Sequence, residues 1–174
     1  MKEYGIDAVP FAHEELDAWR DALKRGVQYA HEPTGLIVRG AIDDVWKGAD
    51  GKIIVADYKA TSKKTEVNLD AEWKDGYKRQ MEVYQWLFRR NGFDVSDTGY
   101  FVYANANSDK AAFDGKLEFD IKIIPYVGKD DWVEPALFKI KETLDSDKIP
   151  KQNDDCDYCT YRDAVGEVLL DCES

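Results

Sequence analysis

Hydrophobic positions divide the chain into helix-like and strand-like segments. Apolar residues recur at helical spacing in three ranges, from Phe11 to Lys24, from Glu72 to Arg90 and from Asp130 to Leu144. Glycines at positions 26 and 92 follow the first two ranges as helix stop signals. We therefore predict three amphipathic helices, of which the second carries the longest apolar stripe.

Between these helices, short β-rich runs are separated by turn residues. Five segments are predicted strands, the first three of them as a meander: Val27–Ala30, Leu36–Trp46, Lys52–Lys59, Gly99–Ala104 and Lys116–Tyr126. The predicted order is α-β-β-β-α-β-β-α. This order favours an α/β fold with a mixed central β-sheet flanked by helices.

Length and charge limit the class of protein. A chain of 174 residues fits a single domain over residues 1–174, here with a cysteine-containing tail at about 145–174. Its apolar runs are too short to span a bilayer and its start lacks the pattern of a signal peptide, so we expect a cytoplasmic protein without a membrane partner. The net charge of −11 opposes non-specific binding to a phosphate backbone.

Carboxylates interrupt two of the predicted strands, in the stretches GAIDDVW and IIVADYKAT. If the turn over residues 48–51 joins these strands as a hairpin, Asp43 lies roughly opposite Ala56 or Asp57. The two carboxylates then become neighbours across the sheet.

A lysine joins the same patch, because side chains alternate along a strand and Asp57 and Lys59 share a face. Adjacent carboxylates are unfavourable unless neutralised, and Mg²⁺ or Mn²⁺ prefers such oxygen ligands. Lys59 would orient or deprotonate a water, or stabilise charge on a phosphate. The alternative is that Asp43 or Asp44 ends a strand and that Asp57 and Lys59 form an edge salt bridge. The hairpin-compatible separation favours the metal site.

A glutamine lies on the apolar stripe of the second helix. Gln80 and Tyr84 are four residues apart and share a face. A buried glutamine requires a hydrogen-bond partner, which the carboxylate patch would supply. A glutamine satisfied within the core is the alternative.

These three pieces, GAID, DYK and QMEVY, together resemble the PD-(D/E)XK nuclease superfamily, specifically its RecB-like branch. That branch includes RecB nuclease domains and CRISPR-associated adaptation nucleases, and the similarity extends roughly from Leu36 to Arg162. The resemblance implies a restriction-endonuclease-like core and hydrolysis of DNA phosphodiester bonds by metal-activated water.

The resemblance also implies roles for individual residues. Asp43 and Asp57 would ligate the metal together with the backbone carbonyl of Tyr58, and Lys59 would be the catalytic lysine. Gln80 and Tyr84 would support the site and contact DNA.

Other residues match relatives less completely. His13 and Glu15 on the first predicted helix are candidates for a further metal ligand. Many relatives hold an iron–sulfur cluster on four cysteines, whereas this chain has only Cys156, Cys159 and Cys172, so we expect no such cluster. A zinc site completed by a histidine remains an alternative to a tail that packs without metal.

Two functions follow from the sequence. The first is a Mg²⁺- or Mn²⁺-dependent deoxyribonuclease with DNA as substrate and, in a DNA-processing complex, a protein partner. The second is a catalytically weak nuclease-fold module that acts through DNA or protein binding. Basic residues that gather in sequence near the site would assist DNA binding, or else form a solvated face: Lys59, Lys63, Lys64, Lys74, Lys78 and Arg79.

Overall fold

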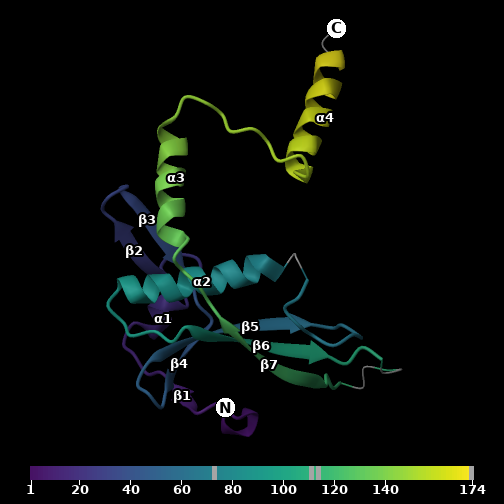
Figure 1. Cartoon of the computed structure of the whole chain (residues 1–174). Helices are drawn as coiled ribbons and strands as arrows, with labels where there is room; N and C mark the ends of the chain where they lie inside the picture. Colours follow the sequence, from purple (N-terminus) through teal and green to yellow (C-terminus); the bar gives the residue numbers. More distant parts are fainter. Residues whose placement is uncertain (72–73, 110–111, 113–114, 173–174) are drawn as a thin grey trace. The chain divides into compact units, whose positions relative to one another are not determined.

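The computed structural model describes residues 1–71, 74–109, 112 and 115–172 (Figure 1). The chain forms two compact units, residues 1–137 and 138–174. The first unit contains η1 (Lys2–Tyr4), β1 (Ala8–Pro10), α1 (Leu16–Trp19), β2 (Val27–His31), β3 (Leu36–Gly40), β4 (Asp44–Gly48), β5 (Ile53–Thr61), α2 (Asp75–Arg90), β6 (Thr98–Ala106), β7 (Phe119–Val127) and the start of α3 (Val133–Asp145). The second unit holds the rest of α3 and α4 (Asp157–Cys172).

Five strands form the central sheet in the order β1-β4-β5-β6-β7. Strands β5 and β6 are parallel, and the other neighbours are antiparallel. A parallel pair needs a crossover connection, which α2 provides by lying across one face of the sheet (Figure 1). The prediction of an α/β fold with a mixed central sheet and flanking helices is confirmed.

The main core lies between α2 and the sheet. The apolar stripe of α2 buries Met81, Leu87 and Phe88 against Val55 and Phe101 of the sheet. The stripe is therefore real, and the helix begins at Asp75, while the predicted first residues 72 and 73 lie outside the described residues. A smaller cluster on the opposite face packs Trp46, Ile54 and Ala56 under the N-terminal segment.

The predicted first helix, Phe11 to Lys24, is wrong in extent. Only Leu16–Trp19 is helical. The carboxylate of Asp21 accepts hydrogen bonds from the backbone N–H groups of Leu23 and Lys24, both at 3.1 Å, and this local turn competes with further helix. Trp19 is 5% exposed and anchors the segment in the core, whereas Leu23 is 88% exposed, so the apolar stripe has no partner surface beyond Trp19.

The predicted three-strand meander is also wrong. The segment expected as one strand from Leu36 to Trp46 breaks at residues 41–43 into β3 and β4. Strand β3 pairs with β2 in a separate two-stranded sheet, and β4 enters the central sheet, where it also pairs with the unpredicted β1. The break occurs because Ile42 turns into the core, and its N–H donates to the carbonyl of Trp19 at 3.1 Å.

The cysteine-containing tail at about 145–174, for which no helix was predicted, contains helix α4. Asp157 in its first turn interacts favourably with the helix dipole. Its apolar residues do not line up on one face, and for that reason the pattern did not predict a helix. Of the helices that the structure describes, none has the length and apolar character needed to cross a membrane.

Candidate active site

The hairpin of β4 and β5 brings the two predicted metal-binding carboxylates opposite one another. In the antiparallel register Asp44 faces Ala56, and each step outward moves both partners by one residue. Asp43 immediately precedes β4, so one further step places it opposite Asp57. This arrangement agrees with the register expected from the turn between the strands.

Asp57 is a buried carboxylate at the point where β5 leaves the core. Its residue is 2% exposed, and Lys59 Nζ contacts its Oδ2 at 2.7 Å as an ion pair. Apart from this ammonium, no hydrogen-bond donor reaches the oxygen in the part of the chain that the structure describes. Burial raises the pKa of Asp57, the charge of Asp43 raises it further, and Lys59 acts against both. Two carboxylates that face one another across the hairpin, one of them buried, suit a hard divalent cation.

Asp43 lies on the exposed side of the patch. Its Oδ2 accepts a hydrogen bond from the backbone N–H of Tyr58 at 2.8 Å. This contact holds the carboxylate over the backbone between Asp57 and Lys59. The Tyr58 side chain takes the opposite face of the sheet, as strand alternation requires.

The neighbouring Asp44 is engaged by protein groups instead. Its carboxylate accepts hydrogen bonds from Tyr58 OH at 2.7 Å, Trp46 Nε1 at 3.1 Å and Arg20 at 2.5 Å. Burial and the Asp44 carboxylate raise the pKa of Tyr58 to about 12, so its phenol stays a donor. Arg20 also donates from Nε to the backbone carbonyl of Asp43 at 3.0 Å. Asp44 and Arg20 thus fix the backbone that carries Asp43.

Lys59 is held by groups from α2 as well as by Asp57. Its Nζ donates to Gln80 Oε1 at 3.2 Å, and Gln80 Nε2 donates to Tyr84 OH at 2.8 Å. The ammonium also lies 4.4 Å from the centre of the Tyr77 ring. The structure therefore joins Gln80 and Tyr84 to the carboxylate patch through Lys59.

Gly40, the first residue of the GAID stretch, has a steric role. A β-carbon at this position would lie 2.6 Å from Cε1 of Tyr84, which is closer than packed carbon atoms come. The tyrosine ring thus packs directly on the backbone that leads to Asp43. This contact links the glycine of one motif to the tyrosine of another.

We expect Asp57→Asn to stabilise the metal-free protein at neutral pH. The pKa of Asp57 is higher in the folded state than in the unfolded state, because burial opposes its ionisation. The protonated carboxyl therefore contributes its full stabilisation below the unfolded pKa, and this stabilisation is lost as pH rises through the folded pKa. The neutral amide removes this loss, with a gain of about 1 kcal/mol, or about 2–4 °C. Thermal unfolding in EDTA measures the gain, which should shrink in acid. Equal melting temperatures at neutral pH would contradict the pKa assignment.

His13 and Glu15, the candidates for a further ligand, have other surroundings. The ring of His13 stacks on Trp19 with 4.5 Å between centroids, and its Nδ1 accepts a hydrogen bond from the backbone N–H of Glu15 at 3.2 Å. Within the described ranges, no three or more His, Cys, Asp or Glu side chains gather as a metal-binding group. Two carboxylates suffice for Mg²⁺, which commonly completes its shell with water and substrate oxygens.

Cys156 and Cys159 contact one another, and the basic residues separate into groups with different partners. Cys156 and Cys159 lie at the start of α4, where the backbone N–H of Cys159 donates to Cys156 Sγ at 3.4 Å, and the side chain of Cys172 is outside the description.

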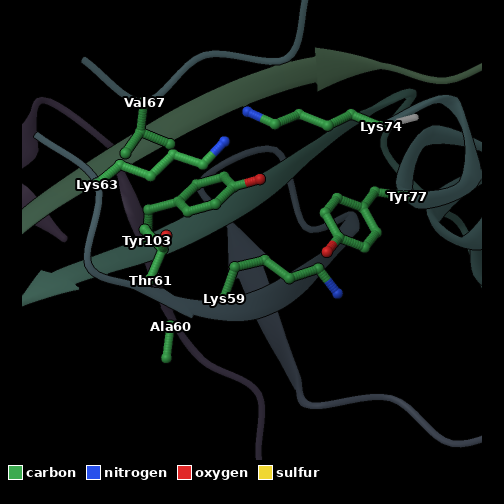
Figure 2. A pocket seen from close by; sticks show the side chains of 8 residues that line it. All are labelled: Lys59, Ala60, Thr61, Lys63, Val67, Lys74, Tyr77 and Tyr103. Atoms are coloured by element: carbon green, nitrogen blue, oxygen red, sulfur yellow. The ribbon is translucent and has the colours of Figure 1, made fainter. Parts of the chain in front are cut away.

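Among the basic residues, Lys64 pairs with Asp109 and Lys78 with Asp75. A third group lines one pocket together with two tyrosines that the sequence did not indicate: Lys59, Lys63, Lys74, Tyr77 and Tyr103 (Figure 2).

Comparison with known proteins agrees with this geometry. A family model described as the PD-(D/E)XK nuclease superfamily matches residues 5–164, a range that includes every residue of the candidate site. No curated protein and no solved structure matches the chain. Members of this superfamily generally hydrolyse phosphodiester bonds of nucleic acids with divalent metals such as Mg²⁺. Because the match covers most of the sequence, the chain belongs to the PD-(D/E)XK nuclease superfamily.

Proposed function

We propose that this protein is a Mg²⁺- or Mn²⁺-dependent deoxyribonuclease of the RecB-like branch, which cuts DNA at the patch of Asp43, Asp57 and Lys59. The observation that carries the proposal is the pairing of two carboxylates across the β4–β5 hairpin, where the buried Asp57 lies opposite Asp43 and next to Lys59. Two carboxylates held together in this way favour a cation ligand over a purely structural role.

The proposed ligands come from the β4–β5 hairpin. Asp57 and Asp43 would each contribute carboxylate oxygen, and Tyr58 its backbone carbonyl. A bound divalent ion supplies charge stabilisation at a phosphoryl oxygen and lowers the pKa of a water ligand. The contacts of Asp44 and Arg20 keep Asp43 in place before any ion arrives.

Lys59 is proposed as the catalytic cation. Its ammonium lies between Asp57 Oδ2 and Gln80 Oε1, where it can orient the attacking water or stabilise the negative charge that develops on the phosphate. The amide of Gln80, itself bonded to Tyr84, restricts the lysine to this position. In this scheme Gln80 is a positioning residue that acts through Lys59, and Tyr84 supports it.

The assignment to DNA and to the RecB-like branch rests on the combined motifs. Three pairs of motif residues meet at one place in the fold, namely Gly40 with Asp43, Asp57 with Lys59, and Gln80 with Tyr84. The acidity of the chain does not oppose this function, because a bound cation converts the carboxylate patch into a phosphate site.

Cleavage of labelled nucleic acids tests the proposal. Single- and double-stranded DNA and RNA of the same sequence are incubated with the protein in Mg²⁺, Mn²⁺ or EDTA. We expect DNA to be cut with either metal and to stay intact in EDTA. Cutting that persists in EDTA would contradict the metal site, and cutting of RNA alone would contradict the choice of DNA. A folded protein that cuts nothing would favour the binding module that acts through DNA or a protein partner.

A further inference from the structure

A small basic pocket adjoins the candidate active site within the first unit (Figure 2). It lies beyond the end of the carboxylate patch, between the last residues of β5, the strand β6 and the approach to α2. Its volume is about 70 Å³, and the residues that line it in the described part of the chain are Lys59, Ala60, Thr61, Lys63, Val67, Lys74, Tyr77 and Tyr103. Three of these residues are lysines and none is acidic, in a chain whose 35 acidic residues outnumber 24 basic ones.

A buried hydroxyl in this pocket lacks a hydrogen bond. Tyr103 is 4% exposed, and its OH has no hydrogen-bond partner in the part of the chain that the structure describes. Figure 2 shows the amino ends of Lys63 and Lys74 turned toward one another beside the Tyr103 side chain. Since buried hydroxyls are normally satisfied, this group indicates a ligand that accepts its hydrogen bond.

The lysines of the pocket repel one another. Lys74 is 3% exposed, and its Nζ donates to the carbonyl of Asn68 and lies 5.6 Å from the centre of the Tyr103 ring. Burial and the positive charge of Lys63 lower the pKa of Lys74, and the carboxylate of Asp70 counteracts them more weakly. An anion between these groups would relieve the repulsion and accept their hydrogen bonds.

The size of the pocket selects the kind of anion. Pockets for drug-sized ligands begin at about 300 Å³, so a cavity of 70 Å³ admits a small group and excludes a nucleoside. Lys59 belongs both to this pocket and to the catalytic patch, so the anion would lie next to the bond that is cut. A strand of nucleic acid carries a further phosphate next to the phosphodiester that is cut.

We propose that the pocket of Lys63, Lys74, Tyr77 and Tyr103 binds a phosphate group of the nucleic-acid strand other than the one that is hydrolysed. This inference rests on the proposed nuclease function, since it places the phosphate relative to Lys59. The Tyr103 hydroxyl donates to a phosphate oxygen, and the two lysines neutralise its charge. The pocket thereby fixes which phosphodiester reaches the carboxylate patch.

Binding measurements with pocket variants test this proposal separately from cleavage. Fluorescence anisotropy with a short fluorescein-labelled single-stranded DNA, in Ca²⁺ and in EDTA, compares the wild type with Tyr103→Phe and Lys63→Ala. Lys64→Ala is the matched control, because Lys64 loses the same charge one residue away, pairs with Asp109 and does not line this pocket. Thermal unfolding of each variant checks that it is folded.

Each pocket variant is expected to weaken DNA binding by about tenfold. Lys63→Ala should also lower the slope of log affinity against log salt by about one, and Lys64→Ala should bind as the wild type does. A purely structural Tyr103 would give a Tyr103→Phe variant with unchanged affinity and equal or higher stability, because the substitution removes only an unsatisfied hydroxyl. Probes with a 5′-phosphate, a 3′-phosphate or hydroxyls at both ends show whether the bound group is terminal or internal.

Wild-type affinity in both pocket variants overturns the phosphate site, whether or not the protein cuts DNA. The phosphate site is also overturned if Lys64→Ala and Lys63→Ala lose DNA affinity equally while Tyr103→Phe loses none. Diffuse surface charge then explains the binding. Pocket-dependent binding by a wild type that never cuts DNA supports the phosphate site and instead overturns the proposed nuclease activity.

Discussion

Replacing Lys59 with alanine is expected to slow DNA cleavage by about a thousandfold while divalent-metal binding stays near its wild-type level. The ammonium contacts Asp57 Oδ2 at 2.7 Å and Gln80 Oε1 at 3.2 Å, so the substitution removes the proposed catalytic cation from the carboxylate patch. The carboxylates remain, and the loss of a neighbouring positive charge does not weaken their attraction for a cation.

Single-turnover cleavage and calorimetric titration with Mn²⁺ separate the two effects in the same variant. Lys47→Ala is the matched control, because it removes an exposed lysine from the neighbouring strand β4. A Lys59→Ala enzyme that cuts DNA within tenfold of the wild-type rate would contradict the catalytic assignment. Loss of cutting together with loss of Mn²⁺ binding would show that the lysine acts on the site's structure.

Asp57→Ala is expected to weaken Mn²⁺ binding by at least about a hundredfold and to abolish cleavage with it. The carboxylate is buried opposite Asp43 with Lys59 as its ion-pair partner, so its removal deletes the innermost proposed ligand. Asp43 alone, exposed and bonded to the Tyr58 backbone, offers a much weaker site.

Titration calorimetry with Mn²⁺ on the folded variant measures this loss. Asp17→Ala removes an exposed carboxylate from α1 and serves as the control for net charge. Equal Mn²⁺ affinity in the wild type and in Asp57→Ala would show that the metal does not bind at this hairpin. The proposed nuclease function would then lose its basis.

The two substitutions at position 57 are complementary. Asparagine at position 57 is expected to stabilise the metal-free protein, because it replaces a buried carboxyl whose pKa is raised. Alanine at the same position is expected to abolish metal binding, because it removes the proposed ligand. The raised pKa of Asp57 means that burial opposes its ionisation, as expected of a carboxylate that a bound cation would stabilise. Asp44, bonded to Arg20, Trp46 and Tyr58, is the structural acid of the same hairpin.

The sequence by itself determined the relations that depend on local geometry. Strand alternation places Asp57 and Lys59 on one face, the turn length sets the β4–β5 register, and helical spacing aligns Gln80 with Tyr84. Each relation involves residues close in sequence, where backbone periodicity alone decides which side chains meet. The apolar stripe of α2 followed from the same periodicity, and the mixed sheet followed from the predicted order of helices and strands.

Only the tertiary structure decided the rest, because the deciding contacts join residues far apart in sequence. Arg20, from the segment that failed to continue as a helix, engages Asp44 and the backbone of Asp43. The turn of Ile42 into the core splits a predicted strand in two. The basic pocket forms only where three segments meet, and these segments carry Lys63, Lys74 and Tyr103. The lowered pKa of Lys74 and the unbonded hydroxyl of Tyr103 therefore result from tertiary packing.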